Sequence, residues 1–149
     1  MSAEIRRLAD GDEDAVLAAR ALFDHEPDID ATRRFLADPN HHLLVAYDAA
    51  GVPVGFVTGV ELTHPDKGTE MFLYELGVDA AVRRRGIGRS LVGALAAVAR
   101  ERGCYDMWTA TEPGNVAART TYLRAGAQPT EPQLVLEWDL GSPARPQDP

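Results

Sequence analysis

A basic loop containing two glycines is the segment of this chain best suited to bind an anion. It spans residues 82–90, Val-Arg-Arg-Arg-Gly-Ile-Gly-Arg-Ser, between an apolar stretch and a predicted helix. Gly86 and Gly88 remove side chains where backbone N–H groups converge, and the following helix adds the positive end of its dipole. The loop therefore suits a phosphate or pyrophosphate, although a solvated basic turn at an ordinary helix start has the same composition. Its spacing matches neither the dinucleotide nor the ATP-binding glycine loop.

A second pattern of spaced residues follows in another predicted helix. Asn115 stands at its start, Ala118 and Tyr122 lie one turn apart on the same face, and Gly126 ends it. A small residue beside a tyrosine leaves space for a slender ligand along this face. Tyr122 alone also fits an ordinary core position of an amphipathic helix. The two patterns together favour a ligand site.

The periodicity of apolar residues and the turn-forming residues predict the elements that position these patterns. The stretch 70–78 carries Phe72, Tyr74, Leu76 and Val78 at a period of two, which predicts a strand with these side chains on one face. Predicted strands cover residues 4–8, 43–47, 54–62, 70–78, 105–110 and 133–139, and predicted helices cover 13–23, 32–36, 87–102 and 116–124.

Length and composition predict one globular domain. The chain has 149 residues, 45% hydrophobic and 26% charged, so we assign residues 1–140 to one domain. Residues 141–149 are Pro-rich with almost nothing apolar, which predicts a disordered tail. The lone Cys104 excludes an internal disulfide, and residues 1–10 lack the apolar stretch of a signal peptide. A cytoplasmic location is therefore predicted.

Charge, apolar run length and residue spacing argue against nucleic-acid, membrane and metal partners. A net charge of −8 disfavours nucleic acid, because neutralising phosphates needs Lys and Arg clustered over a broad face. No apolar run is long enough to span a bilayer, so no membrane partner is predicted. The four histidines and Cys104 lack the spacing of metal ligands, so no metal is predicted. The acidic remainder of the surface would attract cations.

The two patterns together resemble the GNAT family of N-acetyltransferases. The resemblance rests on Arg83-x-x-Gly86-x-Gly88 at a strand-to-helix turn and on Asn115, Ala118, Tyr122 and Gly126 in the next helix, and the order of elements agrees from about Ile5 to Leu140. It implies an α/β (α+β) fold with a mixed, mostly antiparallel sheet of six or seven strands. The sheet is splayed at its middle, about four helices flank it, and acetyl-CoA lies in the gap.

The resemblance also implies a role for each residue of the patterns. The backbone of Leu76–Val78 would pair with the pantetheine arm, Arg84–Arg89 would cradle the pyrophosphate, and Asn115 would contact the pantetheine or fix its helix. Tyr122 would protonate the leaving thiolate as a general acid. The implied cofactor-binding residues are Leu76, Gly77, Val78, Arg83, Arg84, Arg85, Gly86, Ile87, Gly88, Arg89, Ser90, Asn115, Ala118 and Tyr122.

Acetyl transfer to an amine requires a general base, because a protonated amine has no lone pair. Glu75 is our candidate, since it lies on the strand leading into the basic loop and points opposite to Tyr74 and Leu76. Glu112, just after the next predicted strand, is the alternative base. Glu75 also fits a plain surface charge on the exposed face of the sheet.

Within the family, the chain most resembles gentamicin-type aminoglycoside 3-N-acetyltransferases. The likeness rests on residues 21–23, 72–78 and 117–122, and in those enzymes an acidic residue, usually aspartate, occupies the position of Glu75. Asp66, Glu70, Glu75 and Glu112 fall on elements expected to border the acceptor, where carboxylates gather ammonium groups. We therefore predict a small cationic amine, first an aminoglycoside, acetylated by direct transfer.

Several alternatives remain open at this point. The acceptor is otherwise a polyamine, an amino sugar or a lysine-containing peptide, or the domain binds acetyl-CoA without catalysis. A toxin that acetylates charged tRNA is disfavoured by the acidic balance. Relatives of this kind often form dimers through C-terminal strands, so a homodimer with Leu134, Val135, Leu136 and Trp138 at its contact is expected.

Overall fold

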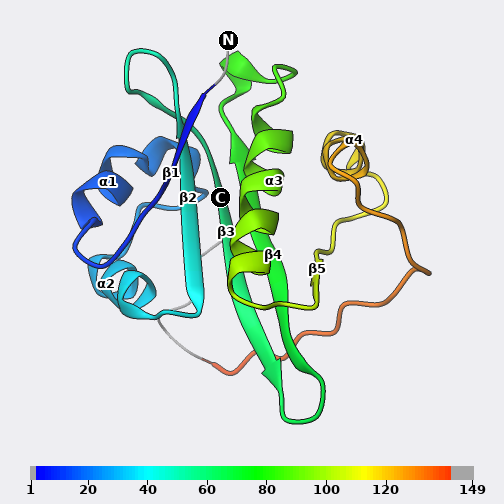
Figure 1. Ribbon diagram of the computed structural model, residues 1–149. Coiled ribbons are helices and arrows are strands. Elements are labelled where there is room, and N and C mark those ends of the chain that lie inside the picture. The colour runs from blue at the N-terminus through cyan, green and yellow to red at the C-terminus, as the bar shows by residue number, and fades with distance from the viewer. Residues whose placement is uncertain (1–2, 142–149) are drawn as a thin grey trace.

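The computed structural model describes residues 3–141, which form one mixed sheet with helices on both faces (Figure 1). Short 3₁₀ turns lie at Arg20–Leu22 and Ala80–Val82. The strands are β1 (Glu4–Arg7), β2 (His41–Tyr47), β3 (Pro53–His64), β4 (Gly68–Val78) and β5 (Asp106–Trp108). The α-helices span Glu13–Ala18 (α1), Ile29–Ala37 (α2), Ile87–Glu101 (α3) and Val116–Arg124 (α4).

The strands lie in the sheet in the order in which they occur in the chain. β1 to β4 pair antiparallel with their neighbours, and β5 pairs parallel to β4 over only three residues, from Glu70↔Asp106 to Phe72↔Trp108. A parallel neighbour needs a crossover connection, and α3 supplies it. The expected mixed, mostly antiparallel sheet is confirmed, but the described residues form five strands in place of the expected six or seven.

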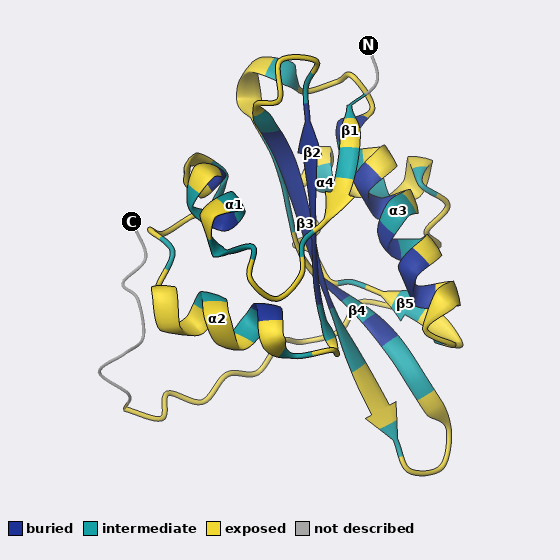
Figure 2. Ribbon diagram, turned by 60° about the vertical axis from the view of Figure 1, so that its left-hand side comes forward, coloured by how far each residue is buried: buried dark blue, intermediate teal, exposed yellow. Residues whose placement is uncertain are grey.

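Each face of the sheet has its own apolar core. α1 and α2 cover one face and α3 covers the other, so that buried residues concentrate on the strands and on the sides of the helices that face them (Figure 2). Leu91, Leu95 and Val98 repeat along one face of α3 and pack on Val57 and Met71. On the other face, α1 and α2 pack on β2 and β3. This core contains Val16, Leu36, Leu43, Val45 and Phe56.

Close packing explains two glycines of the sheet. A Cβ on Gly59 would lie 2.7 Å from a methyl carbon of Leu95, and a Cβ on Gly77 would lie 2.6 Å from a ring carbon of Phe56. Gly59 therefore allows α3 to approach the backbone of β3, and Gly77 allows the Phe56 ring to approach the backbone of β4. Neither glycine has a positive φ, so space and not conformation requires them.

Helix boundaries follow from local caps. The Asp28 carboxylate accepts a hydrogen bond from the Ala31 N–H at 2.8 Å, so α2 begins at Ile29, before the predicted 32–36. The Asn115 side chain accepts from the Ala118 N–H at 3.1 Å and begins α4, whose predicted bounds 116–124 are confirmed. The predicted helix 13–23 is divided, because α1 ends at Ala18 and continues as a 3₁₀ turn.

A β-bulge at Tyr74 changes which face the β4 side chains point to. Thr58 pairs with Glu75 but Gly59 pairs with Leu73, so Tyr74 is an extra residue on β4. Leu73 and Leu76 consequently both contact the α3 core although they are three residues apart. The prediction that Phe72, Tyr74, Leu76 and Val78 share one face is wrong, because the bulge reverses the alternation after Leu73.

The predicted strand 133–139 is also wrong: residues 127–141 contain no helix or strand. A strand needs an edge to pair with, and β5 is only three residues long and leaves the sheet after Trp108. The alternating apolar pattern therefore has no partner, and the segment exposes large side chains. Relative exposure is 88% for Leu134, 77% for Val135, 71% for Leu136, 78% for Trp138 and 89% for Leu140. Of the expected disordered tail, residues 142–149 lie outside the described residues.

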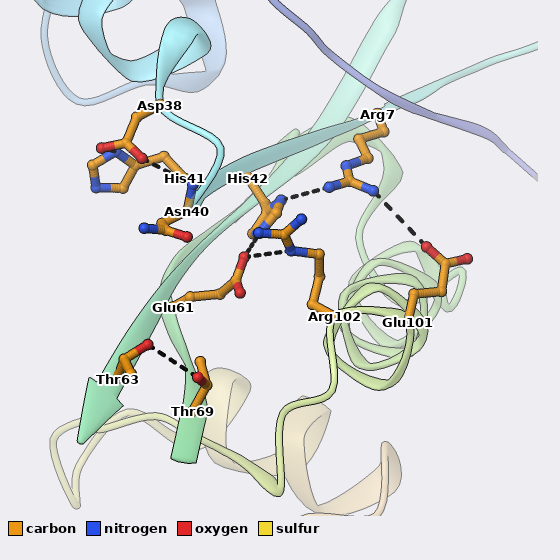
Figure 3. A network of polar contacts seen from close by, with 10 residues as sticks. All are labelled: Arg7, Asp38, Asn40, His41, His42, Glu61, Thr63, Thr69, Glu101 and Arg102. Carbon is orange, nitrogen blue, oxygen red and sulfur yellow. Dashed lines mark hydrogen bonds and ion pairs between the residues drawn. The ribbon is translucent and has the colours of Figure 1, made fainter. Parts of the chain in front are cut away.

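A buried polar network joins β1, β2 and β3 to the end of α3 (Figure 3). The His42 imidazole is 2% exposed and the Glu61 carboxylate 5%, with His42 Nε2 2.7 Å from Glu61 Oε2. Arg7 lies 3.0 Å from His42 Nδ1, and Arg102 Nε donates to Glu61 Oε2 at 2.8 Å. Because a guanidinium only donates, His42 Nδ1 is the acceptor and Nε2–H donates to Glu61. Burial lowers the pKa of His42, in keeping with a neutral imidazole.

Candidate active site

A cavity of about 250 Å³ opens between the sheet and the α1–α2 layer. Its apolar wall comes from α1, α2 and β2. Its polar groups come from α2, from the loop that precedes it, and from the centres of β3 and β4. The apolar lining includes Val16, Phe23, Phe35, Leu36 and Leu43, and the polar lining is Asp24, His25, Thr32, Thr58 and Glu75. A concave, mostly apolar site with a few polar groups is typical of small-molecule binding.

Glu75 is the predicted site residue that lines this cavity. The bulge turns its side chain away from the α3 core, and its backbone N–H donates to Thr58 Oγ1 at 3.1 Å. Partial burial raises the pKa of the Glu75 carboxyl, and the negative charge of Asp24 raises it further, while His25 lowers it. A carboxylate with a raised pKa is a stronger base than an ordinary surface glutamate.

The sheet is splayed directly beside Glu75. β5 accompanies β4 only as far as Phe72, after which the Thr109 hydroxyl donates to the Leu73 carbonyl at 2.9 Å. Leu76, Gly77 and Val78 pair with β3 on one side, and no described strand pairs with them on the other. Apart from the Val78 carbonyl, which accepts from Arg83 Nε, their outward backbone groups are therefore open to an extended ligand, as an unpaired strand edge is.

Tyr122 lies on the α3 side of this opening. Its side chain packs against the α3 core, and its phenol lies near the hydroxyl of Thr109, the residue that follows β5. Burial raises the pKa of the Tyr122 phenol, so that it keeps its proton near neutral pH. Glu75 and Tyr122 thus border the opening from opposite faces of the sheet. Ala118 lies one turn before Tyr122, and the Asn115 amide oxygen is used to cap α4.

The basic loop leads from β4 into α3. Arg84 and Gly86 both have positive φ, at 66° and 81°, and Arg83 Nε donates to the Val78 carbonyl at 3.3 Å. The Ser90 N–H donates to the Gly86 carbonyl at 2.9 Å, so the first turn of α3 leaves the preceding N–H groups without an intrahelical acceptor. Arg83, Arg84, Arg85 and Arg89 are all exposed, and Ile87 is buried. Exposed guanidinium groups around free N–H groups suit a pyrophosphate.

Gly88 has a packing role in addition to the predicted role in the basic loop. A Cβ at this position would lie 3.1 Å from the Thr121 methyl carbon, so Gly88 allows α4 to approach α3. Gly86 instead supplies the left-handed backbone at the start of the helix, with open space around it. Gly86 therefore supplies the backbone conformation of the loop, and Gly88 also allows the close packing of α4 on α3.

The other predicted acidic residues lie away from the cavity. Asp66 is in the β3–β4 turn, and Glu112 is exposed before α4. Glu70 lies on β4 about 17 Å from Glu75 if the strand is extended. Its carboxylate is 2.7 Å from His64 Nε2, and this hydrogen bond lowers the pKa of Glu70. None of these three residues lines the cavity.

Residues that sequence reasoning missed also border the site. Asp24 and His25 come from the loop before α2, Thr58 from β3, and Thr109 from the end of β5. No motif marks them, because each reaches the site only through the pairing of the strands and the position of α2. Within the part of the chain that the structure describes, no three potential ligands cluster as a metal site. No described helix is long and apolar enough to cross a membrane.

Known proteins of similar sequence are acetyltransferases. The chain is 35% identical over 109 residues to an L-2,4-diaminobutyric acid acetyltransferase of Streptomyces avermitilis, covering 70% of this chain and 59% of that protein. It is 39% identical over 79 residues to the protein of the same name from Streptomyces coelicolor, covering 52% of this chain and 45% of that protein. The chain thus spans about half the length of these relatives.

Solved structures of similar fold include aminoglycoside acetyltransferases. One from an uncultured soil metagenomic sample, in complex with sisomicin, has a TM-score of 0.84 at 22% identity, covering 93% of this chain and 96% of that one. AAC(6')-Iy in complex with the bisubstrate analog CoA-S-monomethyl-acetylneamine has a TM-score of 0.79 at 21% identity, covering 93% and 99%. These likenesses establish the fold. The model of the acetyltransferase (GNAT) family matches residues 8–127, and the chain belongs to that family.

Proposed function

We propose that this acetyltransferase transfers the acetyl group of acetyl-CoA directly to a primary amine of a small polycationic molecule. One observation carries the proposal. Glu75 lines a cavity of about 250 Å³, which is large enough for a small amine. The next three residues of β4 lie on the strand edge with which β5 does not pair. An acceptor in the cavity and a thioester along the edge would meet at Glu75.

Each half of the site fits its part of acetyl-CoA. The open backbone of Leu76–Val78 suits the amide groups of the pantetheine arm, and the first turn of α3 with its exposed arginines suits the pyrophosphate. Acetyl-CoA supplies the acetyl group as a co-substrate. Glu75 takes a proton from the attacking amine, and Tyr122 returns one to the departing thiolate. The proton count is thereby balanced without an acetyl-enzyme.

An aminoglycoside is the first acceptor that we propose. The resemblance of residues 72–78 and the fold of aminoglycoside acetyltransferases support it, and the cavity admits a single amine-bearing ring. L-2,4-diaminobutyrate is the second candidate, because the relatives above 30% identity in Streptomyces carry that name. Both candidates hold more than one amine on a compact frame.

The test is acetyl-CoA turnover with each acceptor, measured by thiol release. Glu75→Gln should lower kcat by about 10²–10⁴-fold, as loss of a general base does. Glu70→Gln on the same strand should change kcat much less, because its carboxylate lies far from the cavity. If no amine releases thiol although calorimetry detects acetyl-CoA binding, the domain is a non-catalytic acetyl-CoA-binding module.

We also propose that the protein is a homodimer. Five large apolar side chains between Leu134 and Leu140 are exposed in a single chain, and an apolar patch of this kind is uncommon on a monomer. A second copy would cover it. Light scattering after size exclusion at micromolar concentration should give twice the mass of one chain, and the mass of one chain would contradict the proposal.

A further inference from the structure

Asp24 is the second carboxylate on the cavity wall, and no motif assigns it a role. It lies in the loop that joins the 3₁₀ turn Arg20–Leu22 to α2, whereas Glu75 lies on β4. The two residues are far apart in sequence and face one cavity. Both remain open to solvent at its mouth, so a bound molecule can reach both carboxylates from outside.

The cavity is small enough for one compact molecule to touch both carboxylates. A volume of about 250 Å³ corresponds to a sphere about 8 Å across. Asp24 and Glu75 both line this one cavity, and the negative charge of Asp24 raises the pKa of Glu75. The remaining polar lining residues, His25, Thr32 and Thr58, are an imidazole and two hydroxyls without a fixed charge. Two negative charges therefore face a mostly apolar wall.

One ammonium group balances only one of these two charges. If Glu75 accepts the proton of the reacting amine, the Asp24 carboxylate is left available to bind a second cation. The two nitrogen atoms of an extended 1,3-diamine, with ordinary bond lengths, lie about 5 Å apart. Such a pair fits inside the cavity, with one nitrogen at each carboxylate, and its carbon spacer can lie on the apolar wall formed by residues such as Phe35 and Leu36.

We infer that the site selects acceptors that carry a second amine close to the reacting one, and that Asp24 is the specificity residue that binds this second ammonium. The inference rests on the proposed acetyl transfer at Glu75. The second ammonium also helps the chemistry, because a nearby positive charge lowers the pKa of the reacting amine. Asp24 thus positions the acceptor and orients the uncharged nitrogen toward the open edge of β4.

The test compares a short diamine with a molecule of the same length that lacks the second charge. The acceptors are 1,3-diaminopropane and 3-amino-1-propanol, with 1,5-diaminopentane as a longer diamine, and kcat/KM is measured by thiol release at constant ionic strength. The variants are Asp24→Asn and Asp24→Glu. Glu26→Gln is the matched control, because Glu26 lies in the same exposed loop and does not line the cavity.

We expect the wild-type protein to favour 1,3-diaminopropane over 3-amino-1-propanol, and Asp24→Asn to lower this ratio by about tenfold, as loss of a charge-assisted hydrogen bond does. The dependence on Asp24 is decisive, since a diamine has an advantage of its own from its two nitrogens and its lower amine pKa. Asp24→Glu should keep most of the ratio and favour a different spacer length. Glu26→Gln should keep the wild-type ratio.

Calorimetric titration of 1,3-diaminopropane into the protein with CoA bound separates the two proposals. Binding that weakens about tenfold in Asp24→Asn supports the inference even if no acceptor is turned over, and that result would overturn the proposed acetyl transfer alone. Turnover with the same diamine ratio in Asp24→Asn, Glu26→Gln and the wild type would overturn the inference alone. Diamine binding that does not depend on Asp24 would overturn it as well.

Discussion

Replacing Glu61 by leucine should destabilise the protein strongly. The change removes the carboxylate that His42 Nε2 and Arg102 Nε contact at 2.7 and 2.8 Å, while the partners remain. Because the His42 imidazole is neutral, the change leaves a buried N–H donor without a partner, which costs about 1–3 kcal/mol, and it also removes the ion pair with Arg102. Arg102 keeps 37% of its side chain exposed and can regain water, whereas His42 at 2% cannot. We therefore expect a loss of about 2–3 kcal/mol, which for a domain of this size lowers Tm by about 4–12 °C.

Thermal and urea unfolding at pH 7, followed by circular dichroism, measure this loss. Glu4→Gln is the control, because it removes the carboxylate of another arginine pair, Glu4–Arg6 at 2.9 Å, whose side chains are 64% and 55% exposed. Exposed pairs contribute little, so no resolvable shift is expected. A Glu61→Leu midpoint within about 2 °C of the wild type would refute the reasoning that this network holds β3 to the end of α3.

Three further predictions concern the sheet and the site. Gly77→Ala should lower the free energy of unfolding by about 1–3 kcal/mol, because its Cβ would meet the Phe56 ring at 2.6 Å. Gly93→Ala, at an exposed position of α3, should raise the free energy of unfolding by about 0.5–1 kcal/mol. Urea titration measures both changes. Protonation of the amine acceptor gives log kcat/KM a slope of about one against pH in both the wild type and Glu75→Gln. In the wild type the slope should steepen to about two as the pH falls to where Glu75 also protonates, which lies above the usual glutamate pKa of about 4.3. In Glu75→Gln the slope should stay near one. Tyr122→Phe should lower kcat by about 10²-fold with little change in acetyl-CoA affinity by calorimetry; an unchanged kcat would remove its role as general acid.

Local signals in the sequence predicted the parts of the site that are built locally. Asn115 begins α4 because its side chain caps the helix, and capping depends on neighbours within one turn. The turn at Gly86 followed by α3 is equally local. The predicted orientation of Glu75 opposite Leu76 agrees with the structure, because both residues lie after the bulge, whereas the predicted opposition to Tyr74 relied on an alternation that the bulge interrupts.

Features that depend on distant partners were not predictable in the same way. The bulge at Tyr74 arises from pairing with β3, so the alternation within β4 alone gave Phe72 and Leu76 the same face. Residues 133–139 have the composition of a strand but no edge to pair with. Asp24 reaches the cavity only because α2 and its preceding loop pack over the sheet. Periodicity reports the tendency of a segment, and the sheet decides whether that tendency is realised.

The order of the strands has a consequence for how the chain folds as it is synthesised. Each of β2, β3 and β4 pairs with the strand made just before it, and the β2–β3 and β3–β4 connections are short, so this part of the sheet can form before the rest of the chain is made. β5 must wait until the whole of α3 has been made and crossed over the sheet. The opening beside Leu76–Val78 is therefore complete only after β5 has paired with β4, which is the last step in forming the sheet. We expect a ribosome-bound chain to hold a stable hairpin of β3 and β4 well before it can bind acetyl-CoA.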